Sequence, residues 1–147
     1  MNRNEYLDQF YSLCRQKGLK VTPQRTAVYT ALMDSTEHPT ADMIHQAVKN
    51  DFPGLSLDTV NRTLATFSKI GIVDVLESHG LPRRFEPDLK SHHHFFCLNC
   101  GKIADVTSDV LDHLPVPEQL KNDFVVIGKR VVFRGYCKEC NQASSIP

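Results

Sequence analysis

The residues best able to do chemistry in this chain gather in one short segment, SHHHFFCLNCG at residues 91–101. It combines three histidines with two cysteines, and a second cysteine pair follows within residues 137–140. Imidazole and thiolate groups are common protein ligands of transition-metal ions. So many of these groups in so few positions raise the question of whether the chain binds one metal ion or two.

Four of the five cysteines form two C-x-x-C pairs: Cys97, Cys100, Cys137 and Cys140. Four thiolates in two such pairs have the number and spacing of a closed tetrahedral zinc site. Redox-active pairs are the alternative, but neither pair precedes a helix in the β-α-β setting that thioredoxin-like chemistry requires. We therefore expect a structural Zn²⁺ ion that locks the C-terminal strands together and does not catalyse. The fifth cysteine, Cys14, lies on an apolar helical face and is expected to be buried and inert.

The histidine run needs a different explanation. Alternate residues of a strand project to the same face, so His92 and His94 should share one face while His93 points away. Two carboxylates that occur nearby along the chain are Glu86 and Asp105. Imidazoles combined with carboxylates suit Fe²⁺, Mn²⁺ or Zn²⁺. The pattern predicts a second metal site, and an exposed histidine run without a metal is the alternative that the residues alone leave open.

Helical spacing dominates the first half of the chain and predicts four helices. The first should end at Gly18 and the fourth at Gly71. The three later helices each begin at a residue typical of helix N-caps: Thr22, Thr40 and Ser56. These signals place a helical region ahead of the histidine run.

The fourth predicted helix has two different faces. An apolar stripe formed by Leu57, Val60, Leu64 and Phe67 is expected to face the core. The other faces carry polar side chains that can contact DNA bases or phosphates: Thr59, Asn61, Arg62, Thr63 and Thr66. On this pattern alone, a solvated helix face is an equally good interpretation.

The residues that follow, IVDVLESHGLPRRFEP at 72–87, predict a β-hairpin. A short strand leads to a turn that contains Gly80, and the second strand carries Arg83 and Arg84. A polar last helix followed by a hairpin is the order of elements in a winged helix-turn-helix DNA-binding domain.

From His92 onward the pattern changes to short β-type runs: HHFFC, KIADV and FVVIGKRVVFRGYC. One helical piece, SDVLDHL, lies between the second and third runs. The sequence therefore predicts an α+β protein. Residues 1–87 should form the winged-helix domain, and residues 88–147 an α/β domain that holds the four-cysteine zinc site.

Local charge supports a nucleic-acid partner more than the overall charge does. The formal net charge is +0, which argues against strong sequence-independent binding by the whole chain. Between Gln9 and Met33, however, four cations and no carboxylate occur: Arg15, Lys17, Lys20 and Arg25. We expect Arg15, Lys20 and Arg25 to contact DNA together with the polar face of the fourth helix.

Composition predicts a soluble cytoplasmic protein. Hydrophobic residues make up 41% and charged residues 23%, which are ordinary globular values. No apolar run approaches the ~18 residues of a membrane span. The start, MNRNEYLDQF, lacks the apolar core of a signal peptide, so we expect no membrane partner.

Several segments resemble the ferric uptake regulator family in both order and spacing: TPQR, HPTAD, LSLDTVNRTL, RRFEP, HHHFFCLNCGKI and the final C-x-x-C. The resemblance covers almost the whole chain. It implies a homodimer whose winged helices bind palindromic operator DNA and whose C-terminal domains dimerise and hold the structural zinc. It also implies a regulatory Fe²⁺ or Mn²⁺ ion held by five ligands: His38, Glu86, His92, His94 and Asp105.

The branch of the family is indicated by small departures. Asp105 resembles the peroxide-responsive repressors, whereas iron-responsive members usually have glutamate there; Glu86 points the other way. A further site of iron regulators uses two histidines at positions that hold Ser91 and Lys129 here, so we expect that site to be absent. The family's usual TVYRTL is TVNRTL, so Asn61 replaces an operator-contacting tyrosine and can bond adenine instead.

The resemblance therefore favours a repressor that senses hydrogen peroxide and is not an enzyme. Iron at the regulatory site would react with peroxide, and oxidation of His38 or His92 would release the metal and the operator. Peroxide would act only as a signal, with no other small-molecule substrate.

Three other functions are weighed against this one. The nearest is an iron- or zinc-availability regulator of the same architecture. A metallohydrolase using His92, His94, Glu86 and an open water position lacks an obvious nucleophile or substrate pocket. A bare zinc ribbon fused to an interaction helix bundle is distinguished by whether the protein binds DNA only with added metal.

Overall fold

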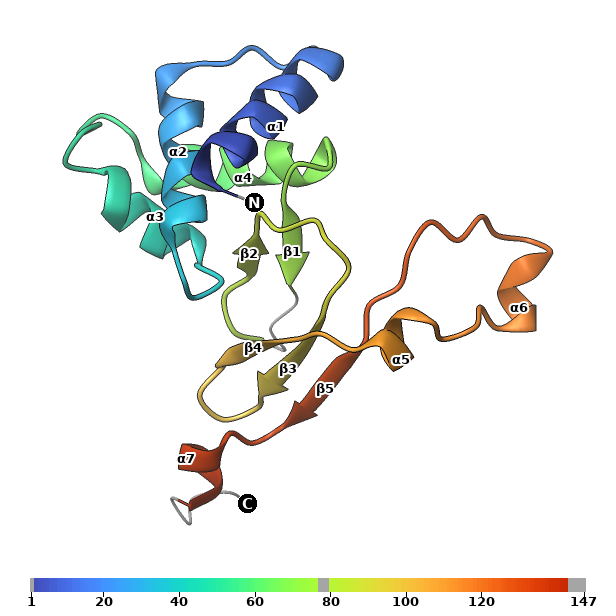
Figure 1. The fold of residues 1–147 in the computed structure, drawn as a ribbon. Coiled ribbons are helices and arrows are strands. Elements are labelled where there is room, and N and C mark those ends of the chain that lie inside the picture. The colour runs from blue at the N-terminus through green and yellow to red at the C-terminus, as the bar shows by residue number, and fades with distance from the viewer. Residues whose placement is uncertain (1, 77–79, 143–147) are drawn as a thin grey trace. The chain divides into compact units, whose positions relative to one another are not determined.

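A computed structural model of the chain describes residues 2–76 and 80–142. Its contacts divide the chain into a first unit, Met1–Leu89, and a second unit, Lys90–Pro147. The first unit contains helices and a hairpin, and the second contains a three-stranded sheet with short helices (Figure 1). Among the described residues, no helix is both long and apolar enough to cross a membrane.

Side-chain caps begin all four helices of the first unit: α1 (Arg3–Gln16), α2 (Pro23–Asp34), α3 (Ala41–Val48) and α4 (Leu57–Lys69). The cap residues are Asn2, Thr22, Thr40 and Ser56, and each accepts a hydrogen bond from a backbone N–H three residues further on. The three predicted N-caps are therefore confirmed. Gly18, at φ +67°, ends the first helix as expected.

The core of the first unit is aromatic. Phe10 of α1 stacks on Tyr29 of α2 with ring centroids 4.4 Å apart, and Phe67 of α4 meets Phe10 edge-on at 5.5 Å. Val60 and Leu64 are fully buried beside them, which confirms most of the predicted stripe of α4. Leu57 is the exception: it is 37% exposed, because it lies in the first turn of α4 and lines a surface groove instead of the core.

The predicted hairpin is present. Strand β1 (Asp74–Leu76) pairs antiparallel with β2 (Arg84–Glu86), and Val75 lies opposite Phe85. Part of the expected turn, residues 77–79, lies outside the described residues. Helices α2 to α4 followed by this two-stranded wing form a winged helix-turn-helix, as predicted.

In the second unit, β3 (His93–Cys97) is the central strand of a three-stranded sheet. It pairs antiparallel with β4 (Ile103–Val106) and parallel with β5 (Val132–Gly135). The chain between β4 and β5 carries α5 (Asp109–Asp112) and α6 (Glu118–Lys121), and Figure 1 shows this excursion extending away from the sheet. Helix α7 (Lys138–Gln142) follows β5.

One predicted strand is shorter than expected. The run at 124–137 was predicted to be strand-like, but only Val132–Gly135 pairs with a neighbouring strand among the described residues. Val125 and Ile127 are 91% and 97% exposed. Sequence alternation identifies a β-type segment, but a strand also needs a partner, and residues 124–130 have none within the described part of the chain.

Candidate metal and DNA-binding sites

The four predicted zinc ligands lie together in the second unit. Cys97 ends β3 and Cys100 occupies the turn that follows, while Cys137 follows β5 and Cys140 lies in α7. All four sulfur atoms lie within 4.8 Å of one another, and all four cysteines are free thiols. Two segments far apart in the sequence thus supply one compact cluster.

Backbone hydrogen bonds explain why the pairs meet. The N–H of Leu98 donates to the carbonyl of Gly135 at 2.8 Å, which joins the first turn to the end of β5. The first turn is closed by the N–H of Gly101 donating to the carbonyl of Cys97, and Gly101 has φ +76°, which glycine adopts without strain. The second pair spans the start of α7, a helix that the sequence did not predict.

The cluster has the dimensions of a zinc site, while the pKa shifts of its thiols differ in direction: the pKa is lowered for Cys97 and raised for Cys100, Cys137 and Cys140. A tetrahedral ion with Zn–S bonds of about 2.3 Å places its sulfur atoms about 3.8 Å apart. The Sγ atoms of Cys100 and Cys137 are 3.8 Å apart. Burial raises the pKa of the Cys97 thiol, but backbone N–H groups of Cys100, Cys137 and Asn99 outweigh it and lower that pKa to about 6. The donor set therefore fits Zn²⁺ well.

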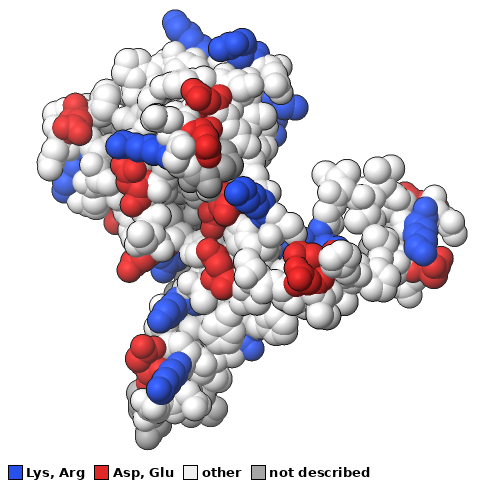
Figure 2. Space-filling model, in the orientation of Figure 1, with Lys and Arg blue, Asp and Glu red and all other residues white. Residues whose placement is uncertain are grey.

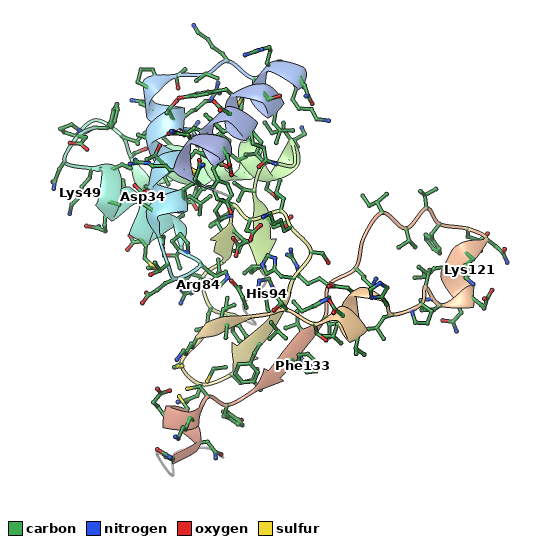
Figure 3. The ribbon with its side chains drawn as sticks, viewed as in Figure 1. Asp34, Lys49, Arg84, His94, Lys121 and Phe133 are labelled. Atoms are coloured by element: carbon green, nitrogen blue, oxygen red, sulfur yellow. The ribbon has the colours of Figure 1, made fainter. Side chains whose placement is uncertain are left out.

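A second group of ligands lies on one face of the same sheet. His94 (Figure 3) and Asp105 are opposite each other on β3 and β4, and His94 Nε2 lies 3.3 Å from Asp105 Oδ1. His92 Nε2 lies 3.7 Å from the same oxygen, and the two imidazole rings are 4.7 Å apart, centroid to centroid. The structure thus brings His92, His94 and Asp105 together, a donor set of two imidazoles and a carboxylate.

The other two predicted regulatory ligands meet within the first unit. His38, in the loop before α3, has its Nε2 atom 2.9 Å from Oε2 of Glu86 at the end of β2. The other carboxylate oxygen of Glu86 accepts a hydrogen bond from the N–H of Asp88 at 2.8 Å. Both oxygens of this carboxylate are therefore held in place beside the His38 ring.

His93 does not join either group. Its Nδ1 atom accepts the backbone N–H of Val131 at 3.0 Å, so the proton is on Nε2, which donates to Asp112 Oδ1 at 3.0 Å. Ser91 donates to the same oxygen at 2.9 Å, and Lys129 donates to the Asp112 carbonyl. The sequence predicted that His93 lies on the opposite face of the strand, but it did not identify Asp112 as its partner. The polar residues Ser91 and Lys129 were the features of the sequence that could have indicated a buried polar contact here.

The predicted DNA-reading face of α4 is only partly open. Asn61 and Arg62 are exposed; Arg62 lies 3.2 Å from Asp58, and Asn61 donates to the carbonyl of Leu57 at 3.3 Å. Thr59 and Thr63 are half-buried, and the Thr63 hydroxyl donates to the Thr59 carbonyl at 2.8 Å. Of the five polar residues predicted on this face of α4, Asn61 and Arg62 are exposed, and each makes a contact within the helix, while Thr59, Thr63 and Thr66 are half-buried.

A groove of about 1050 Å³ runs beside this face of α4. Its lining includes Asn61 and Arg62 together with Lys69, a cation in the last turn of α4 that sequence reasoning did not select.

The N-terminal cations differ in role. Arg15 and Lys20 are exposed near the turn between α1 and α2, where Figure 2 shows Lys and Arg side chains gathered at one end of the first unit. Arg25 is half-buried, and its Nη1 donates to the Lys20 carbonyl at 2.6 Å. Its guanidinium therefore fastens this turn.

A winged helix joined to a unit that holds a thiolate cluster and an imidazole–carboxylate face defines a class of protein, the metal-responsive DNA-binding regulator. Residues 16–134 match the model of the Ferric uptake regulator family, and the chain belongs to that family. The predicted α+β fold and the predicted family are both confirmed. Members are transcriptional regulators that bind operator DNA as dimers, and they are not enzymes.

Individual relatives fall in more than one branch of the family. The chain is 39% identical to the "Peroxide-responsive repressor PerR" of Staphylococcus aureus over 91% of its own length and 90% of that protein. The solved structure of the Helicobacter pylori ferric uptake regulator Fur matches with a TM-score of 0.77 and 26% identity, covering 99% and 97% of the two chains. PerR from Streptococcus pyogenes matches with a TM-score of 0.52 and 30% identity over 90% of each chain.

Proposed function

We propose that this protein is a metal-dependent transcriptional repressor that senses hydrogen peroxide. The observation that carries the proposal is the identity of the residue beside His92 and His94, which is Asp105, in a chain 39% identical to a peroxide-responsive repressor. Aspartate at this position resembles the peroxide-responsive branch, and its oxygen lies within 3.7 Å of both imidazoles.

The four cysteines Cys97, Cys100, Cys137 and Cys140 hold a structural Zn²⁺ ion in this proposal. Their sulfur separations suit a tetrahedral ion, and four thiolates leave no coordination position open for a substrate. Zinc joins the turn after β3 to the segment after β5, so its role is to hold the ends of the sheet together.

The regulatory Fe²⁺ or Mn²⁺ ion is held by His38 and Glu86 from the first unit and by His92, His94 and Asp105 from the second. Each set already pairs imidazole with carboxylate inside its own unit. Nitrogen and oxygen donors suit these ions, in contrast to the thiolate cluster. One ion bound by both sets would fix the orientation of the two units, which is how metal occupancy selects the DNA-binding shape.

The protein acts as a homodimer on palindromic operators. In the second unit, large apolar side chains are exposed (Phe133 in Figure 3): Phe124, Val125, Ile127, Val132 and Phe133. A second copy of the same unit is the occupant that a dimeric family implies for this surface. The α4 residues Asn61 and Arg62 then read bases. The remaining residues contribute weaker contacts or contacts that position the protein on the DNA: Thr59, Thr63, Arg15, Lys20 and Arg25.

Fe²⁺, when bound, would activate hydrogen peroxide, and the imidazole would supply the two electrons that reduce it. The chain supplies the target: one oxygen atom of peroxide is added to the ring of His38 or His92, and the other leaves as water. The oxidised ring is a poorer ligand, so the two ligand sets separate and the operator is released. The protein is consumed in the process and does not turn over.

Mass spectrometry tests this function. Zinc-containing protein loaded with Fe²⁺ and given a brief peroxide pulse should gain one oxygen atom on the peptide that contains His38 or His92, and DNA affinity should fall in parallel. Manganese-loaded protein should resist. Release of DNA only on metal chelation, with no oxidised histidine, would establish an iron-availability regulator instead. Glu86, which resembles that branch, and the fold similarity to Fur of Helicobacter pylori favour this second candidate.

A further inference from the structure

The loop that carries His38 has an unusual backbone. His38 has φ +28°, and among the non-glycine residues of the described chain it alone has a positive φ. Side chains with a Cβ atom rarely adopt this region, so the surrounding structure must hold the residue there. Such outliers gather at ligand-binding positions.

Strand β2 supplies the groups that hold this loop. Arg84 (Figure 3) donates from Nη1 to the carbonyl oxygen of His38 at 3.3 Å, and the N–H of Phe85 donates to the carbonyl of Pro39 at 3.0 Å. The same Nη1 atom of Arg84 lies 3.8 Å from the sulfur of Met43, in the first turn of α3. The guanidinium therefore joins the loop, the start of α3 and the wing.

The next residues of β2 complete the arrangement. Phe85 is 5% exposed and packs into the core, so Arg84 and Glu86 lie on the opposite face of the strand. Arg84 contacts the backbone of His38, and Glu86 contacts its ring, with 2.9 Å between His38 Nε2 and Glu86 Oε2. Two residues of one strand thus fix both the main chain and the side chain of the same histidine.

We propose that Arg84 is a positioning residue for the regulatory metal: it holds the His38 backbone in its positive-φ conformation and so aims the imidazole. This inference rests on the proposed function, because it takes His38 as a ligand. Residues that hold a ligand in place without touching the metal often change affinity by about 10- to 100-fold when replaced.

The test compares two neighbouring arginines. R84M removes the donors while keeping an unbranched side chain, and R83M removes an equal charge from the exposed side chain next to it. Mn²⁺ is titrated into each zinc-containing protein in the absence of DNA. R84M should bind Mn²⁺ at least about tenfold more weakly than wild type. R83M should match wild type. R84K, which keeps a single cationic donor nitrogen, should bind Mn²⁺ with an affinity between those of wild type and R84M.

A purely structural role would lower the melting temperature of the protein without Mn²⁺ and leave the affinity unchanged. Wild-type affinity in folded R84M therefore overturns the inference. If R84M does not fold, R84K decides, since wild-type affinity in that variant also overturns it. If the wild-type protein binds no Mn²⁺ in addition to its zinc, the proposed regulatory metal site is wrong. That result differs from equal Mn²⁺ affinity in wild type and R84M, which overturns only the role of Arg84.

Discussion

His93 and Asp112 form a hydrogen bond of 3.0 Å whose direction is fixed by a third group, the N–H of Val131 on the far side of the imidazole. His93 is fully buried. The pair links the central strand β3, which carries the proposed ligands His94 and Cys97, to α5 and to the residues just before β5. It is therefore the polar junction of the second unit.

Replacing Asp112 with alanine should destabilise the second unit, because the buried Nε2–H of His93 loses its acceptor. Urea unfolding followed by circular dichroism should show a lower midpoint for D112A. The control is D109A, an exposed carboxylate in the same short helix. Equal urea midpoints for wild type and D112A would mean that the hydrogen bond between His93 and Asp112 does not contribute to stability.

The difference in stability between wild type and D112A should depend on pH in a defined direction. The Ser91 hydroxyl and then the His93 ring lower the pKa of Asp112 below its ordinary value. A lowered folded-state pKa gives stability that is complete above the ordinary carboxyl pKa of about 4 and is lost as the pH falls through the lowered value. The gap between wild type and D112A should thus stay constant from about pH 8 to pH 5 and close only in stronger acid.

Removing one zinc ligand should remove the metal. C137S leaves three thiolates, and metal binding is coupled to folding of the segment it joins, so zinc content and dimer should be lost together. Elemental analysis and size-exclusion chromatography measure both. C14A is the matched control, because Cys14 is buried in the first unit and is not one of the four clustered cysteines. A folded, dimeric, zinc-free C137S protein would contradict the structural role.

The DNA face of α4 can be tested at Arg62. Its ion pair with Asp58 is exposed on both sides, so it holds the arginine weakly and leaves it available to a base. R62A should lose about 1–3 kcal/mol of operator discrimination at matched salt. R3A removes an exposed arginine of α1 and should bind as wild type does. If both variants bind equally well, α4 does not read the operator through this residue.

Asp105 should decide how the regulatory site responds to peroxide. D105E keeps the charge but moves the carboxylate by one methylene, so metal-dependent DNA binding should persist while histidine oxidation falls. Peptide mass spectrometry of the iron-loaded variant after peroxide measures the change. D109E adds the same methylene at an exposed position and should oxidise as wild type does. If histidine oxidation in D105E equals that of wild type, Asp105 does not determine the response of the site to peroxide.

Local signals in the sequence were the ones that predicted structure well. Thr22, Thr40 and Ser56 mark helix starts because a cap interacts only with the next turn. The cysteine spacing predicted the thiolate cluster for a similar reason, since each C-x-x-C turn is local. The link between Arg84 and His38 was not predictable, because it joins residues 46 positions apart and depends on how the wing packs.

The difference between local and long-range signals also explains why the partner of His93 and the limits of β5 were not predicted. Alternation placed His93 on the opposite face from its neighbours but carried no information about Asp112, which lies 19 residues further on. The β-type pattern at 124–130 was genuine, but whether a strand forms depends on a partner that the sequence does not name.

The parallel pairing of β3 with β5 leads us to expect that the second unit is completed late in folding. His93 and Val131 are 38 residues apart, and contacts over such distances form slowly because a long loop must close first. During synthesis, the helical unit and the Cys97–Cys100 turn emerge before Cys137 and Cys140 exist. If the cluster binds zinc, as proposed, Cys97 and Cys100 are available to the ion before Cys137 and Cys140 are. On that proposal, chains made without zinc should have a folded first unit and an incomplete second unit.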